Sequence, residues 1–112
     1  MDFNTKQAKG RIEQIAHLMS ELVVEYVNEA EEVSLGEIEQ GMRQLLQAVG
    51  QQAMAQVLTD SDQPAASIRC ACQQQARYRC RRAGMVITVF GRVQYKRSYY
   101  VCAHCGRGEK PL

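Results

Sequence analysis

Cys70-Ala71-Cys72 and Cys102-Ala103-His104-Cys105 are the stretches that decide the fold, and an arginine-rich segment with strand-like patterning separates them. Each close pair of cysteines can hold one side of a tetrahedral ion, which is typical of a zinc ribbon. The second pair has the usual Cys-x-x-Cys spacing, whereas the first, Cys-x-Cys, is one residue tighter and less specific. Four thiolates close the coordination sphere of Zn²⁺ and leave no position for a substrate water, so the ion is predicted to be structural. Its predicted ligands are Cys70, Cys72, Cys102 and Cys105.

Two further side chains of this region belong to the same analysis. Cys80 lies in a strand-like segment, and we expect it to be a small buried residue rather than a metal ligand. His104 lies inside the second pair and could replace a cysteine, but we expect it to point to solvent or to phosphate. A redox role for Cys102 and Cys105 lacks the βαβ context of such motifs.

The length and the cysteine count limit the class of protein. A chain of 112 residues suits one domain or two very small ones. The N-terminus has no secretory signal pattern, and no apolar run is long enough to span a bilayer. We therefore expect a cytoplasmic protein without a membrane partner. In that compartment thiols stay reduced, so five clustered cysteines favour metal binding over disulfides.

The net charge of +2 conceals a strong division along the chain. Residues 1–64 contain four basic and eleven acidic residues, a charge of −7, whereas residues 65–112 contain ten basic and one acidic residue, a charge of +9. This asymmetry predicts an acidic domain over 1–64 and a basic domain over 65–112. The basic domain is the candidate for phosphate binding, and mutual attraction of the two halves is the alternative.

The acidic half has the pattern of two α-helices. Apolar residues recur every three or four positions from Ile12 to Val27, as on one helix face. Ser34 and Glu37 form a capping-box signature for a second helix, which ends before Pro64. We expect an antiparallel two-helix hairpin, which alone buries too little apolar surface to be stable. It should pack on the ribbon, form a homodimer, or dock in a larger complex through helices 12–27 and 35–58.

The basic half has the two-residue period of β-strands. Arginines alternate at positions 77, 79 and 81, which predicts one cationic strand face. A turn at Ala83-Gly84 and a hairpin at Gly91 predict a meander of three short strands. On the returning strand, 92–101, the predicted apolar face comprises Val93, Tyr95, Tyr99 and Val101, with Arg97 as an exception. The other face comprises Arg92, Gln94, Lys96, Ser98 and Tyr100. The fold class predicted from both halves is α+β, a helical hairpin followed by a small antiparallel zinc ribbon.

Cations and tyrosines are unusually dense on the predicted sheet. Arginines interleaved with tyrosines are typical of surfaces that follow phosphates and stack on bases, although we expect the tyrosines mainly to form the core. The predicted nucleic-acid contacts are Arg77, Arg79, Arg81, Arg82, Arg92, Lys96 and Arg97.

A family resemblance covers residues 67–112. It rests on Arg82, Thr88, Gly91, Val93, Arg97, Tyr99-Tyr100, Cys102, Cys105, Gly108 and Pro111-Leu112. In this order they resemble the N-terminal zinc-ribbon region of Kra-type bacterial insertion-sequence transposases. The resemblance implies a ribbon ahead of an RNase H-like catalytic domain that uses acidic residues. Because the sequence ends at Pro111-Leu112, we expect a truncated relative, a regulatory short form or a reused DNA-binding module, none of which is an enzyme by itself.

The function expected from these observations is a non-catalytic zinc-ribbon module that binds nucleic acid, DNA rather than RNA, within a transposition or other nucleoprotein complex. The alternative is an adaptor whose helical hairpin mediates dimerisation or another protein–protein contact in such an assembly.

Overall fold

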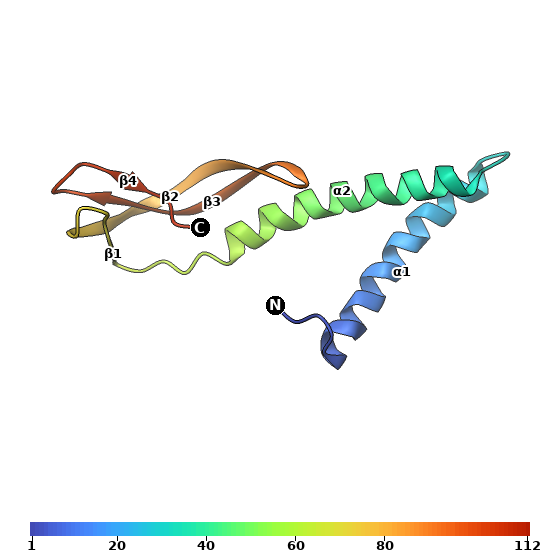
Figure 1. Ribbon diagram of the computed structural model, residues 1–112, viewed down its shortest axis with the longest axis horizontal. Helices are drawn as coiled ribbons and strands as arrows, with labels where there is room; N and C mark the ends of the chain where they lie inside the picture. Colours follow the sequence, from blue (N-terminus) through green and yellow to red (C-terminus); the bar gives the residue numbers. More distant parts are fainter. The chain divides into compact units, whose positions relative to one another are not determined.

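Two helices followed by four strands make up the computed structural model, which describes residues 1–112 (Figure 1). The helices are α1 (Lys6–Glu29) and α2 (Leu35–Asp60), and the strands are β1 (Ser67–Arg69), β2 (Gln75–Thr88), β3 (Gly91–Cys102) and β4 (Gly108–Glu109). The strands form one antiparallel sheet in the order β1-β2-β3-β4. The predicted α+β class is confirmed. Neither helix is long and apolar enough to cross a membrane.

The chain forms two compact units, Met1–Leu46 and Gln47–Leu112. The boundary falls inside α2, so the C-terminal part of this helix belongs to the same unit as the sheet. The change of charge at residue 64 lies inside the second unit, and the domain division drawn from it stays a prediction.

Both helix starts in the first unit are capped by side chains. Thr5 Oγ1 accepts a hydrogen bond from the Ala8 N–H at 3.1 Å. Ser34 Oγ accepts one from the Glu37 N–H at 3.2 Å and donates to the Glu37 carboxylate at 3.4 Å, so Ser34 caps α2 as predicted, while the carboxylate binds its hydroxyl rather than its N–H. These bonds satisfy N–H groups that have no partner inside the helix.

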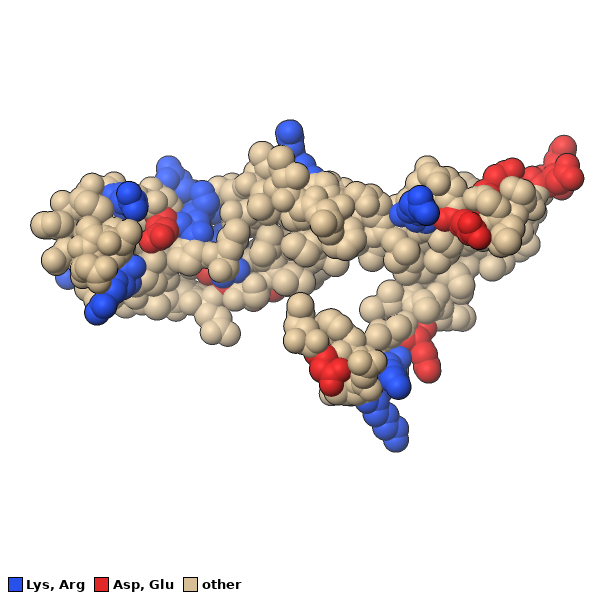
Figure 2. All heavy atoms as spheres, viewed as in Figure 1, with Lys and Arg blue, Asp and Glu red and all other residues tan.

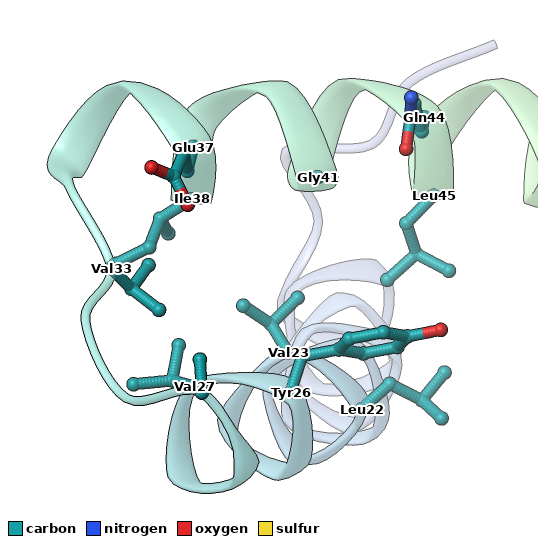
Figure 3. A pocket seen from close by; sticks show the side chains of 11 residues that line it. Leu22, Val23, Tyr26, Val27, Val33, Glu37, Ile38, Gly41, Gln44 and Leu45 are labelled. Carbon is teal, nitrogen blue, oxygen red and sulfur yellow. The ribbon is translucent and has the colours of Figure 1, made fainter.

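The two helices of this unit meet around their connection and enclose an apolar groove there. Its cavity has a volume of about 350 Å³ (Figure 3). The groove is lined by Leu22, Val23, Tyr26, Val27, Ala30, Val33, Glu37, Ile38, Gly41, Gln44 and Leu45. Further along α1 the start of the predicted apolar stripe stays open, since Ile12 and Ile15 are 46% and 52% exposed, whereas Met19 is buried. The helices of this unit therefore leave much of their apolar surface uncovered.

The sheet of the second unit is built on a long β2–β3 hairpin. Gly91 follows the tight turn and has a φ of +100°, which confirms the hairpin predicted there. The turn predicted at Ala83-Gly84 is wrong, because β2 runs through both residues without a break. Gly84 pairs with Tyr95 across the strands, and the absence of a Cβ at this position leaves room for the tyrosine ring. The sheet consequently has four strands, and the predicted meander of three short ones is wrong.

The C-terminal part of α2 covers the edge of β3 that faces away from β2. The Gln51 side chain donates to the Arg92 carbonyl at 2.6 Å, and Thr59 Oγ1 accepts from the Lys96 N–H at 3.2 Å. Near the hairpin turn the ring of Phe90 lies against Gly50. Side chains of the helix thus satisfy main-chain groups that a neighbouring strand would otherwise bind.

The segment that follows α2 continues onto β3 and buries two residues of the face opposite the predicted apolar one. Asp62 Oδ2 accepts from the Ser98 N–H at 2.9 Å and from its hydroxyl at 2.7 Å. The Tyr100 hydroxyl donates to the Ala65 carbonyl at 3.1 Å and accepts from the Ala65 N–H at 2.9 Å. Ser98 is 1% and Tyr100 3% exposed, so both faces of this strand are buried near its end, and Tyr100 lies in the core as expected for the tyrosines. The alternating pattern could not show it, because the covering segment comes from elsewhere in the chain.

Candidate metal centre and basic surface

Two tight turns at one end of the sheet carry the cysteine pairs (Figure 1). In the turn between β1 and β2, the Gln73 N–H donates to the Cys70 carbonyl at 2.9 Å, and the Cys70 N–H donates to the Gln74 carbonyl at 2.8 Å. In the turn between β3 and β4, the Gly106 N–H donates to the Cys102 carbonyl at 2.8 Å, and the Cys102 N–H donates to Arg107 at 3.0 Å. The two turns follow the same plan, and the first is one residue shorter. This difference accommodates the tighter Cys-x-Cys spacing.

A left-handed residue follows the second cysteine in both turns. Gln73 has a φ of 74° and Gly106 a φ of 75°. Glycine adopts this conformation without steric strain, whereas glutamine does not. The turn before β2 is therefore the more strained of the two.

The four sulfur atoms converge between these turns. All four Sγ atoms lie within 4.8 Å of one another, and each of the two closest contacts joins one turn to the other. The Cys70 and Cys105 sulfurs are 3.5 Å apart, and those of Cys72 and Cys102 are 3.6 Å apart. Four thiolates at about 2.3 Å from a tetrahedral ion would be separated by about 3.8 Å. The four cysteines chosen from the sequence thus form a group that could hold a metal ion.

The thiols differ in burial and in proton affinity. Cys70 and Cys102 are buried, whereas Cys105 is exposed. The Gln74 amide lowers the pKa of Cys72, but burial and the three neighbouring thiols outweigh it and raise this pKa to about 12. The Cys105 amide, then that of His104, lowers the pKa of Cys102 to about 7 against the effect of burial. Without an ion the group therefore ionises unevenly, and binding of a metal must displace the proton of Cys72.

The sulfur cluster continues into the small apolar core at this end of the sheet. Cys70 and Cys102 pack with Ala76 and Tyr100, and Ile68 and Cys72 lie against this cluster. Tyr78 meets Tyr100 edge-on, with ring centroids 5.9 Å apart. An ion held by the cysteines would therefore anchor both turns and the core beneath them.

The predictions for Cys80 and His104, which lie outside the four-cysteine cluster, have different outcomes. Cys80 is exposed, so its prediction as a buried residue is wrong. It lies on β2, opposite Tyr99 of β3. His104 is exposed in the second turn, as expected.

A β-bulge on β2 changes the predicted arrangement of the arginines. The register moves by one residue between Tyr78 and Cys80, and Arg79 is the extra residue. Arg77 therefore lies opposite Val101, whereas Arg81 lies opposite Ser98, on the other face of the sheet. The single cationic face predicted for positions 77, 79 and 81 is wrong. Arg82, opposite Arg97, returns to the face of Arg77.

Two of the residues predicted to bind nucleic acid instead bind other groups of this protein. Arg81 Nη2 donates at 2.9 Å to the carbonyls of Thr59 and Lys96. Arg97 donates to the Leu58 carbonyl at 2.7 Å, to Ser61 Oγ at 3.1 Å and to the Pro111 carbonyl at 2.7 Å. Both guanidinium groups thus bind carbonyls in the last turn of α2, the negative end of the helix dipole.

The sequence contains a signal for the structural roles of Arg81 and Arg97 that the predictions above do not use. The last turn of α2 has no basic residue of its own, and Ser61 rather than glycine follows Asp60. A helix end with these features needs donors from elsewhere in the chain.

The remaining cations are free to meet a ligand. Arg77, Arg79, Arg82, Arg92 and Lys96 are exposed, and none has a carboxylate within ion-pair distance. The Arg82 guanidinium lies 4.4 Å from the centre of the Tyr99 ring. Lys and Arg side chains stand out over the sheet, whereas Asp and Glu gather at the connection of the helices (Figure 2).

One further cation shares the face of Arg77 and Arg82. Arg69 on β1 is exposed, and Ser67 of the same strand lies directly opposite Arg77. Alternation along β1 places Arg69 on that same face. Arg69 is not among the nucleic-acid contacts predicted from the sequence. Arg69, Arg77 and Arg82 with Tyr99 are called the basic face below.

Residues 28–107 match the model of a family described as Uncharacterised protein family (UPF0236). The chain belongs to the UPF0236 family. The UPF0236 match contains α2, the β2–β3 hairpin and all four cysteines of the cluster, while most of α1 lies before it. No match was found among curated proteins or among solved structures.

Proposed function

We propose that this chain is a non-catalytic zinc-ribbon module that binds nucleic acid, DNA in preference to RNA, as the recognition part of a transposase-like nucleoprotein complex. The observation that carries the proposal is the basic face, where Arg69, Arg77 and Arg82 share one side of the sheet with Tyr99, Arg82 lies over its ring, and no acid pairs with these arginines. Unpaired arginines around an aromatic ring are suited to phosphates and bases. The preference for DNA and the link to transposition are supported by the resemblance to transposase ribbons.

The metal in this proposal is a structural Zn²⁺. Four soft thiolates in a tetrahedral arrangement favour zinc, and a site with four protein ligands has no open position for catalysis. A cytoplasmic location would keep the thiols reduced and available. Zinc would tie the two turns together and so hold the basic face in shape.

Elemental analysis of the purified protein tests the metal. We expect one zinc ion per chain and, after substitution with Co²⁺, the absorption spectrum of a tetrahedral thiolate site. Cys102→Ser should lose the metal, whereas the matched variant Cys80→Ser should retain it because Cys80 lies outside the cluster. A protein that contains no metal and keeps its fold in strong chelator would refute the zinc site.

Titrations of labelled duplex DNA, single-stranded DNA and RNA at several salt concentrations test the ligand. Each phosphate contact contributes about −0.9 to the slope of log K against log salt on duplex DNA. Arg77→Ala and Arg82→Ala should each weaken binding and reduce this slope by about 1. Arg43→Ala removes an exposed cation from the acidic unit and should change neither quantity. Undetectable or salt-independent binding would exclude the nucleic-acid function, and tighter binding of RNA would exclude DNA as the preferred ligand.

The alternative function is a protein–protein adaptor that uses helices 12–27 and 35–58. It is favoured by the exposed stripe of α1 and by the groove between the helices (Figure 3). Ile15, 52% exposed, stands in the middle of the stripe. Ile15→Glu should abolish an association through this surface, and sedimentation measures the loss.

A further inference from the structure

The two edges of the β2–β3 hairpin differ in how their main-chain groups are satisfied. On β3, the outward N–H groups of Lys96 and Ser98 are bound by Thr59 and Asp62. On β2, β1 pairs with residues Gln75–Arg77 only, and the Tyr78 N–H binds the Ala66 carbonyl. Beyond Tyr78 no strand or side chain of the second unit binds the outer edge of β2. One edge is therefore covered, and the other is open over most of its length.

The register identifies which groups of the open edge are free. In an antiparallel ladder, residues alternate between pointing their main-chain groups at one neighbour and at the other. Lys96 and Ser98 point theirs away from β2, and they lie opposite Ala83 and Arg81. Arg81, Ala83, Met85 and Ile87 must therefore point their N–H and C=O groups away from β3. This row of unpaired donors and acceptors is a template for another strand.

The side chains along this row show that only part of the edge is protected against pairing with another strand. The bulge at Arg79 and the charges of Arg81 and Arg82 are features that discourage edge pairing. From Ala83 to Phe90, however, the chain contains no charged residue and no proline. Met85 is 49% and Ile87 74% exposed on this stretch. Exposed apolar residues on an open, uncharged edge indicate that a second strand covers it.

We propose that the open edge of β2 pairs with the same edge of a second copy of this chain. An antiparallel pairing about Gly84 is self-complementary: Ala83 lies opposite Met85 of the second copy, and Arg81 lies opposite its Ile87. All four outward residues then gain partners, through about eight main-chain hydrogen bonds. No arginine faces an arginine in this register, and the apolar side chains of the two copies form one strip.

The occupant is assigned to a second copy because this register sets Ala83 opposite Met85 and keeps every arginine away from the arginines of the other copy. An edge this short buries less than the roughly 1,600 Å² of a standard interface. The dimer should therefore dissociate reversibly, with a Kd on the order of 10–100 μM. The two-fold axis stands perpendicular to the joined sheet, so the basic faces of both copies point to the same side. The pairing itself does not depend on what those faces bind.

Amide hydrogen exchange of the zinc-loaded full chain, without nucleic acid, tests the pairing at the residues concerned. At low protein concentration the amides of Arg81, Ala83, Met85 and Ile87 should exchange fast. At millimolar concentration they should become protected at least about tenfold, in step with dimer formation seen by sedimentation. The amides of Gly84 and Val86, which bind β3, should be protected at both concentrations. A chain that stays monomeric to 1 mM, or a dimer without protection at these four amides, would overturn the proposal.

Two variants that differ only in the sign of a charge test the register. Ile87→Lys sets a lysine opposite Arg81 of the second copy and should weaken dimerisation by about tenfold or more, whereas Ile87→Glu should retain or strengthen it. Arg92 of the same chain lies opposite residue 87, so the metal content and unfolding transition of both variants are compared first. Val24→Lys, at a 51% exposed position on α1 and outside the edge, is the control and should dimerise normally.

Equal effects of the two variants at residue 87, or the reverse order, would contradict this register. A dimer that survives Ile87→Lys but is lost in Ile15→Glu would assign self-association to the helices and overturn the proposal.

Discussion

Gln73 and Gly106 occupy equivalent places in the two turns that carry the cysteine pairs, and only one of them is a glycine. Both have left-handed backbone angles, with φ of 74° and 75°. We expect Gln73→Gly to stabilise the metal-loaded protein by about 1 kcal/mol, because a side chain in this conformation is strained. Gly106→Ala should destabilise it by a similar amount. Urea unfolding of both variants measures these changes, and a destabilised Gln73→Gly would contradict the strain argument.

Arg97 shows that a basic residue on this sheet can be structural. Its guanidinium donates to Leu58, Ser61 and Pro111, so Arg97→Ala should destabilise the fold by about 1–3 kcal/mol. Arg97→Lys should restore only part of this loss, because an ammonium cannot reproduce the planar fork. Arg77→Ala, at an exposed position, should change the unfolding free energy by less than about 0.5 kcal/mol. A loss of DNA affinity in Arg97→Ala without a loss of stability would refute this division of roles.

At the scale of the elements, α2 has a close approach at Gly50 and open space at Gly41. A Cβ at Gly50 would collide with the ring of Phe90, whereas a Cβ at Gly41 would meet nothing within 4 Å. Gly50→Ala should therefore destabilise the protein by about 1–3 kcal/mol. Gly41→Ala should stabilise it by up to about 1 kcal/mol, because alanine favours helix. Thermal unfolding of the pair measures the difference, and a stabilised Gly50→Ala would show that Phe90 does not rest on the helix.

The length of β2 depends on packing between strands, which the pattern of residues along the chain does not show. Gly84 has the composition of a turn, yet it lies in mid-strand because the Tyr95 ring occupies the space of its missing side chain. The bulge at Arg79 similarly changes which face each later residue takes. A shift of one residue reverses every later assignment, so alternation predicted the strand but not its faces.

At the scale of the whole molecule, metal binding should be strongly dependent on pH. Cys72, with a pKa of about 12, stays protonated up to neutral pH, so its displaced proton should lower the apparent affinity about tenfold for each pH unit lost. Cys102, with a pKa of about 7, adds to the loss once the pH falls below 7. From pH 8 to pH 6 the affinity should fall by at least about a hundredfold. Competition with a chromophoric chelator measures it, and an affinity independent of pH would contradict these assignments.

Removal of the metal should affect the second unit unevenly. The turns around Cys70 and Cys102 share their core with the sulfur cluster, so their amides should lose protection in chelator. The hairpin end is held by Gln51, Thr59 and Phe90 through contacts that involve no cysteine, and the amide of Val93 should stay protected. Uniform loss of protection would show that the ion supports the whole unit.

The sequence by itself determined the helices, the β2–β3 hairpin and the cysteine cluster, because these depend on local signals. The helix cap at Ser34, the turn before Gly91 and the two close cysteine pairs each act within a few residues of the chain. The α+β order and the four candidate ligands could therefore be predicted without coordinates.

Only the tertiary structure decided the roles of the arginines and of the strand edges. Arg81 and Arg97 bind the end of α2, while Arg69 joins Arg77 and Arg82. Ser98 and Tyr100 are buried by the segment after α2, and the outer edge of β2 stays open. These outcomes depend on which distant groups meet in space. Charge and alternation along a chain do not carry that information, because hydrogen bonds between remote segments are formed only when the chain folds.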